Sequence, residues 1–249
     1  MKRQIAAILF VGTVFGAVAQ KVPFCDTSRP DRMIEVGLDV GVGISSMLQN
    51  MNTAVPEVSD FSFTSGCMTS FGVTAEMPVR NYFAIGTALN FNINNYSYNM
   101  VILHQEGRTL NSIVSQSHFY NLDVPVFFDF RFNLGNKVRW HNEVGGYLSF
   151  GAGGNTKTRS YVSSTNALGQ SQVTEIYYKR DYFNDSQSVI NGVNSLDWGL
   201  HLATGIVACR HVMLKAVMHV GARDLACNYG VLKIENHTLN LSFKAGYVF

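Results

Sequence analysis

Apolar and polar residues alternate with a period of two along most of this chain. In the closing segment LNLSFKAGYVF, nearly every second position from Leu239 to Phe249 is apolar. Strict alternation of this kind indicates a β-strand with one apolar face, and no helical periodicity competes with it. The sequence predicts eight such strands, at residues 34–44, 71–77, 83–93, 120–132, 138–150, 196–206, 212–220 and 239–249.

The connections between these segments alternate between short and long. The short ones are residues 78–82, 133–137 and 209–211. The long ones are polar and rich in Asn, Ser and Thr, and they cover residues 45–66, 94–118, 151–194 and 222–237. Short turns at one end and long loops at the other are typical of a transmembrane β-barrel, whose short turns lie in the periplasm.

The less apolar face of each strand separates a membrane barrel from a soluble barrel of the lipocalin type. A soluble barrel turns its apolar side chains inward, whereas a membrane barrel turns them outward and fills a small interior with polar groups. Here that face combines glycines with charges of both signs, which suits a narrow lumen. The charged and histidine residues on it are Glu35, Asp39, Glu76, Asp123, Asp129, Arg131, Arg139, His141, Glu143, Asp197, His201, Lys215, His219, Arg223 and Lys244.

Composition agrees with this orientation. Only 14% of the residues are charged, against roughly 25% in a typical soluble domain. Aromatic residues on the apolar face fall into two groups, as expected at the two bilayer interfaces. The sequence therefore predicts an all-β fold: an eight-stranded antiparallel transmembrane β-barrel with short periplasmic turns and long extracellular loops, whose last strand closes against the first.

The first 19 residues have the features of a secretory signal peptide. Lys2 and Arg3 precede a short apolar core, and Ala17-Val18-Ala19 forms a cleavage site. We expect residues 1–19 to be removed, residues 20–33 to form a periplasmic segment, and residues 34–249 to form the barrel. Cleavage leaves 17 basic against 17 acidic residues, so nucleic-acid binding has no electrostatic support.

Several motifs resemble those of the PorT-like outer-membrane β-barrel family of Bacteroidetes. FYNLDVPVFFDFR, residues 119–131, resembles the family's YLEIPLLLKY segment, with Asp123 in place of the usual Glu. Four further segments resemble the family in the right order: EVGGYLSF, LDWGLHLATGIV, LKAVMHVGARDL and HTLNLSFKAGYVF. The loop at 151–194 is long for the family, and the match is loosest near Arg223. The family's founding member serves the type IX secretion and gliding apparatus.

The resemblance implies a non-enzymatic outer-membrane protein with a structural or partner-binding role, as an accessory of type IX secretion. Its partners would be outer-membrane lipid and secretion-machinery proteins, the latter through loops 151–194 and 222–237. Tyr161, Tyr177, Tyr178, Tyr182 and Phe183 of the first loop would supply a contact surface. A small porin-like pore is the alternative, although side chains fill the interior of an eight-stranded barrel.

An outer-membrane lipid-modifying enzyme is a third reading. Ser117 and His118 are the nearest nucleophile and base in the sequence, but adjacent residues of a strand point to opposite faces. No catalytic residue is therefore assigned. The chain also lacks a Gly-rich phosphate loop and a metal-spacing motif, so no cofactor is predicted.

Hairpin register predicts contacts inside the lumen. A turn at 209–211 sets Asp197 opposite Arg223 and His201 opposite His219, and the hairpin around residues 133–137 sets Asp129 opposite His141. Charges in a low-dielectric interior need partners, so these pairs are expected to be structural. The two facing histidines either hold a transition metal, with Glu143 or His141 as a further ligand, or form neutral hydrogen-bonded imidazoles.

The chain contains four cysteines and is expected in an oxidising compartment. Cys25 and Cys209 fall at the periplasmic side, and Cys67 and Cys227 at the extracellular side. Sidedness limits the disulfide pairs to Cys67–Cys227 and Cys25–Cys209, with four buried thiols as the alternative.

Overall fold

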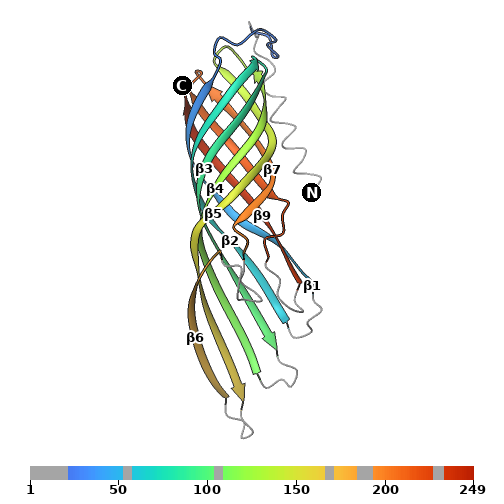
Figure 1. Ribbon diagram of the computed structural model, residues 1–249, viewed down its shortest axis with the longest axis vertical. Coiled ribbons are helices and arrows are strands. Elements are labelled where there is room, and N and C mark those ends of the chain that lie inside the picture. Colours follow the sequence, from blue (N-terminus) through green and yellow to red (C-terminus); the bar gives the residue numbers. More distant parts are fainter. Residues whose placement is uncertain (1–21, 53–57, 104–108, 166–170, 184–192, 227–232) are drawn as a thin grey trace.

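The computed structural model describes residues 22–52, 58–103, 109–165, 171–183, 193–226 and 233–249, which form nine β-strands (Figure 1). These are β1 (Glu35–Asn52), β2 (Val58–Arg80), β3 (Phe83–Leu103), β4 (Thr109–Asn133), β5 (Val138–Thr165), β6 (Ser171–Asp181), β7 (Leu196–Ala208), β8 (Val212–Gly221) and β9 (Lys233–Val248). In this part of the chain, no helix has the length and apolarity needed to cross a bilayer. The predicted signal peptide lies outside the described residues and stays a prediction.

Eight of these strands close into an antiparallel ring. Strands β1 to β5 pair in chain order, β5 pairs with β7, and β7, β8 and β9 follow. Strand β9 then pairs with β1, and the N–H of Phe249 donates to the carbonyl oxygen of Val36 at 2.8 Å. Because each strand of the ring has two neighbours, its wall has no open sheet edge. The predicted eight-stranded barrel is confirmed.

The strands run further than alternation predicted, so much of the expected loop at 45–66 and at 94–118 is strand. The β3–β4 ladder continues to the pair Leu103 and Leu110, and β1 continues to Asn52. Alternation is lost at residues 109–118 because polar residues occupy both faces, whereas Tyr96, Tyr98 and Met100 do alternate with Asn95, Ser97 and Asn99. The polar side chains still hydrogen-bond across the strands, as Ser115 does with Thr158 at 3.1 Å.

The expected loop 151–194 also contains regular structure. Strand β5 continues to Thr165, and β6 returns antiparallel to it along Asn155–Thr165. Strand β6 is the ninth strand and lies outside the ring, at the free end of the sheet. Figure 1 shows the β5–β6 hairpin extending from one end of the barrel, whereas residues 22–34 and the end of β9 lie at the other. We call the end with the short turns the periplasmic end.

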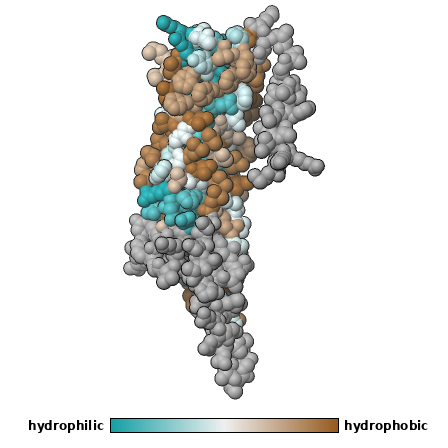
Figure 2. Space-filling view, turned by 90° about the vertical axis from the view of Figure 1, so that its right-hand side faces the viewer, coloured by the Kyte–Doolittle hydropathy of each residue, from teal (hydrophilic) through white to brown (hydrophobic). Residues whose placement is uncertain are grey.

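The barrel is apolar outside and polar inside. Val42 and Phe243 on the outer wall are 65% and 64% exposed, whereas Asp39 and Asp129 in the lumen are 4% and 0% exposed. Figure 2 shows apolar side chains covering much of the barrel wall towards its periplasmic end. This arrangement is the inverse of a soluble barrel and suits contact with lipid. The predicted orientation is confirmed.

Aromatic side chains on the outer wall gather at two levels. Near the periplasmic end, Phe83 contacts Phe130 with ring centroids 5.5 Å apart, and Phe132 contacts Trp140 at 5.8 Å. At the other level, the rings of Phe91 and Tyr120 stack at 6.0 Å. Such rings favour the interface between hydrocarbon and headgroups, so the two levels mark the edges of the apolar band.

Bulky and small residues fit together in the lumen. Phe127 points inward and is 2% exposed. A Cβ atom added to Gly86 would lie 2.5 Å from the Phe127 ring, and one added to Gly145 would lie 2.8 Å from its Cβ. The glycines on β3 and β5 therefore make room for this ring, and the interior is filled by side chains.

Candidate functional site

The centre of the lumen holds a chain of contacts between ionisable side chains. Glu143 accepts a hydrogen bond from Lys215 at 3.1 Å and one from Nε2 of His201 at 3.0 Å. Nδ1 of His201 lies 2.8 Å from Nε2 of His219, whose Nδ1 lies 3.3 Å from Asp123 Oδ2. All five side chains are buried. Their charges and hydrogen-bonding groups are matched across four strands, β4, β5, β7 and β8.

The proposed metal ligands His201, His219 and Glu143 come together through the predicted β7–β8 register, in which the two histidines are directly opposite. Their nitrogens are too close for metal bridging: two nitrogens on one tetrahedral zinc ion would lie about 3.3 Å apart. Both ring nitrogens of His201 already have partners, His219 and Glu143. The geometry fits the hydrogen-bonded pair of imidazoles.

Nearer the periplasmic end, Arg131 contacts three carboxylates. Its guanidinium lies 2.9 Å from Glu35 and 2.7 Å from Asp129, and it also pairs with Glu76. Nδ1 of His141 lies 2.8 Å from Asp129 Oδ2. Sequence reasoning did not assign this cluster, although the facing positions of Glu35 and Glu76 on β1 and β2 were a signal of a shared cation.

The contact between Asp129 and His141 forms in a different register from the predicted one. Asp129 lies directly opposite Glu143, and His141 lies opposite Arg131. The turn closes with the N–H of Leu134 donating to the carbonyl of Val138, so it is tighter than expected and shifts the pairing by two residues. Asp129 and His141 meet as diagonal neighbours instead.

Three ligand-type groups in this cluster, Glu76, Asp129 and His141, have donor atoms within 4.8 Å of one another. Arg131 contacts both carboxylates, so a cation already neutralises part of their charge. Glu76, Asp129 and His141 therefore form an ion-pair network with Arg131.

A further ion pair links the first and last strands of the ring. Nζ of Lys244 on β9 donates to Asp39 on β1 at 2.8 Å and to Asn90 on β3 at 2.6 Å. Sequence analysis placed Lys244 and Asp39 in the lumen without pairing them. Their contact spans non-adjacent strands as well as the closing seam, so the register of one hairpin could not reveal it.

The predicted pair of Asp197 and Arg223 is wrong. The β7–β8 ladder ends at Gly199 and Gly221, two residues short of the position where Asp197 and Arg223 would meet. Asp197 instead accepts a hydrogen bond from the Tyr147 hydroxyl at 2.8 Å. Strand β8 ends at Gly221, so Arg223 does not lie opposite Asp197.

An aromatic cluster covers the extracellular end of the lumen. Tyr182 is 2% exposed; its ring stacks on Phe119 at 4.1 Å and its hydroxyl contacts that of Tyr96 at 2.9 Å. Met47, Val193 and Leu225 pack in the same cluster. The prediction that Tyr182 belongs to an exposed contact surface is wrong, because the residues that directly follow β6 pack against the barrel. Tyr177 on β6 is exposed as expected, at 56%.

Between the Arg131 cluster near the periplasmic end and the aromatic cluster at the extracellular end, the lumen contains little empty space. The cavity beside Asp123, His219 and Lys244 has a volume of about 10 Å³, and the one beneath the aromatic cluster about 40 Å³. A single water needs roughly 10–15 Å³. These spaces are too small for an open passage through the described part of the barrel.

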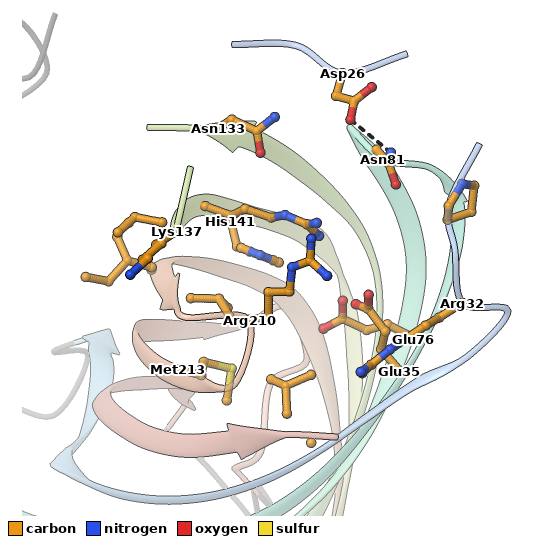
Figure 3. Close-up of a pocket in the computed structure, with 18 of the residues that line it drawn as sticks. Asp26, Arg32, Glu35, Glu76, Asn81, Asn133, Lys137, His141, Arg210 and Met213 are labelled. Atoms are coloured by element: carbon orange, nitrogen blue, oxygen red, sulfur yellow. Dashed lines mark hydrogen bonds between the residues drawn. The ribbon is translucent and has the colours of Figure 1, made fainter. Parts of the chain in front are cut away.

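A larger cavity of about 370 Å³ opens at the periplasmic end, which we call the vestibule (Figure 3). The N-terminal segment 22–34 forms part of its rim. The Phe24 ring stacks on Phe132 at 4.9 Å, and the Asn81 side chain donates to Asp26 at 2.9 Å. Hydrogen bonds from Ser28 lower the pKa of the Asp26 carboxyl.

The cysteines differ from expectation. Cys25, Cys67 and Cys209 are exposed free thiols, so the Cys25–Cys209 bond was wrong, and so was the alternative of buried thiols for these three. Phe24, the residue before Cys25, stacks on Phe132, whereas Cys209 lies in the β7–β8 turn. Cys227 lies outside the described residues, but Cys67 is a free thiol, so the expected Cys67–Cys227 bond was wrong as well.

Ser117 and His118 do not form a dyad. Ser117 is buried and its hydroxyl lies 3.0 Å from that of Thr156, whereas His118 contacts Asn95 and Tyr120. The two side chains thus engage different partners, as alternation along a strand requires.

Comparison with known proteins agrees with this architecture. The sequence matches a family described as "Outer membrane protein beta-barrel domain" over residues 18–223, which is more than half of the chain. The chain belongs to this outer-membrane β-barrel family. It is therefore an outer-membrane protein, and the apolar wall described above is the surface that contacts lipid. No curated protein matches the sequence.

Three solved outer-membrane proteins are similar to this chain at low sequence identity. OprG from Pseudomonas aeruginosa is 9% identical, with a TM-score of 0.44, covering 92% of this chain and 99% of its own. Ail of Yersinia pestis, solved with the heparin analogue sucrose octasulfate, is 10% identical, with a TM-score of 0.34, covering 86% and 99%. Neisserial surface protein A is 13% identical, with a TM-score of 0.29, covering 87% and 97%.

Proposed function

We propose that this protein is a closed, non-enzymatic outer-membrane scaffold that binds protein partners outside the cell, as an accessory of type IX secretion. The observation that carries the proposal is the combination of a filled lumen with a long exposed hairpin. The ion pairs of Glu143, Arg131 and Lys244 occupy the interior. The β5–β6 hairpin extends the sheet beyond the ring.

The hairpin has the character of a recognition surface. Val173, Ile176 and Tyr177 on β6 are 65%, 49% and 56% exposed. Strand β6 is also an edge strand, and such an edge offers backbone donors and acceptors to a partner strand. Exposed aromatic and aliphatic groups next to a free edge favour binding of another protein.

The alternatives have weaker support. A pore needs a continuous passage, and the lumen is blocked by the His201–Glu143 network and the Tyr182 cluster. A lipid-modifying enzyme needs a nucleophile next to a base, and Ser117 and His118 contact other groups. The type IX assignment rests on the PorT-like segments, above all residues 119–131, which span the lumen-lining part of β4.

Crosslinking in intact outer membranes tests the partner-binding role. We expect components of the secretion machinery to be recovered with the wild-type protein. The double substitution Val173→Ser with Tyr177→Ser should lower that recovery about tenfold, a loss that corresponds to about 1.4 kcal/mol of binding free energy. The matched control, Gln172→Ser with Thr174→Ser, changes polar positions of the same strand and should leave recovery unchanged.

Recovery of barrel-assembly factors alone would contradict the accessory role. Equal recovery with both double variants would contradict the hairpin as the contact surface. Surface expression of each variant, measured by protease accessibility on whole cells, ensures that a lost signal reports binding.

A further inference from the structure

The vestibule at the periplasmic end collects basic side chains from three separate parts of the chain. Arg29 and Arg32 come from the N-terminal segment, Lys137 and Arg139 from the β4–β5 turn and the start of β5, and Arg210 from the β7–β8 turn. In Figure 3, Arg210 and Lys137 approach from one side of the cavity and Arg32 from the other. Residues distant in sequence thus converge on one space of about 370 Å³.

Three of the five acidic residues that line the vestibule are in ion pairs. Glu35 and Glu76 pair with Arg131, and Glu143 pairs with Lys215. Asp26 accepts hydrogen bonds from the neutral side chains of Ser28 and Asn81, so Asp26 and the exposed Asp31 have no ion pair in the described part of the chain. None of the five basic residues has an ion pair within 4.0 Å in the described part of the chain.

Arg139 is repelled by two neighbouring arginines. Electrostatic interactions of Arg139 include repulsion from Arg131 and Arg210, offset by attraction to Glu35 and Asp26. The five basic side chains outnumber Asp26 and Asp31, the two lining carboxylates without an ion pair in the described part of the chain. An excess of one sign of charge around a low-dielectric cleft raises the potential of that sign inside it. A bound anion would relieve this repulsion.

We propose that the vestibule binds a small soluble anion that carries phosphate or carboxylate groups. The guanidinium of arginine presents a planar set of donors that suits both groups, often with two parallel hydrogen bonds. The volume lies within the roughly 300–1,000 Å³ of small-molecule sites. The cavity lies inside the ring of strands, so its ligand enters from periplasmic solution.

Isothermal titration of the purified full-length mature barrel in neutral detergent tests this site, with inorganic phosphate and citrate as separate probes at constant ionic strength. We expect saturable binding of at least one probe, and the comparison identifies the preferred group. Arg139→Gln with Arg210→Gln should weaken binding about tenfold or more. Lys157→Gln with Lys179→Gln removes the same charge from exposed positions on the extracellular hairpin and should leave affinity within about twofold.

The proposal would be overturned if neither probe bound saturably. It would also be overturned if the two double variants lost the same amount of affinity. Arg139 is half-buried, so the double variant can lose stability. The single variant Arg210→Gln, at an exposed turn, then decides the matter: about threefold weaker binding supports the site, and wild-type affinity contradicts it.

Discussion

Replacement of Glu143 by alanine is expected to lower the free energy of unfolding by about 3–5 kcal/mol. Glu143 is 3% exposed and is the carboxylate that faces both Lys215 and His201. Its loss leaves the buried ammonium group of Lys215 without a counter-charge, and desolvated charges without partners are strongly destabilising. Denaturant titration of the barrel in phospholipid vesicles, followed by tryptophan fluorescence, measures the change.

Two further variants separate the ion pair from simple loss of packing. Glu143→Met combined with Lys215→Met removes both charges while filling the space, and should recover most of the lost stability. Glu175→Ala on the exposed face of β6 should change stability by less than about 0.5 kcal/mol. A double variant as unstable as Glu143→Ala would show that the network does not act through paired charge.

The second large effect is expected on the outer wall. Val42→Arg should destabilise the barrel by about 2–4 kcal/mol, because Val42 lies in the apolar band and an arginine there must enter hydrocarbon. Val173 on the β6 hairpin has the same exposure, 65%, but lies beyond the ring. Val173→Arg should therefore change stability by less than about 0.5 kcal/mol.

The free energy of unfolding of Val42→Arg and Val173→Arg, measured in phospholipid vesicles, gives a matched comparison. Both variants replace a valine of the same exposure. Equal effects would contradict the assignment of the β1 wall to lipid and of the hairpin to water. A neutral Val42→Arg would contradict the apolar exterior itself.

The face of each strand and the register of β7 with β8 could be predicted from the sequence. Both depend on the period of two in the positions of apolar residues. The facing positions of His201 and His219 followed from a single short turn. The β4–β5 register failed by two residues because a turn between Asn133 and Val138 can close with different numbers of residues. Small differences in turn closure move every pair of the ladder.

Other features depend on tertiary contacts that alternation does not encode. Arg131 reaches Glu35 on β1 and Glu76 on β2, and these contacts depend on strand stagger around the ring. Tyr182 is buried because the chain after β6 returns to the barrel mouth, which no local pattern indicates. Strand β6 itself was missed because its residues SQVTEIYYKRD show no apolar stripe, and Gln172–Tyr177 are exposed on both faces of the strand.

The vestibule could not be predicted from the sequence, because its lining residues come together only in the folded barrel. Arg32, Lys137 and Arg210 are far apart in the sequence, and only the ring brings their segments to one end. Sequence analysis assigned residues 20–33 to the periplasm but not to any site. The contacts of Phe24 with Phe132 and of Asp26 with Asn81 make this segment part of the cavity wall.

Single-molecule conductance in planar bilayers tests the central claim, that paired charges and packed side chains close this lumen. Co-flotation with vesicles first establishes that the purified protein is inserted. The structure predicts no steady ionic current across the inserted wild-type barrel, because the spaces near His219 and beneath Tyr182 hold about 10 and 40 Å³. A steady, voltage-independent current through single wild-type molecules would contradict it.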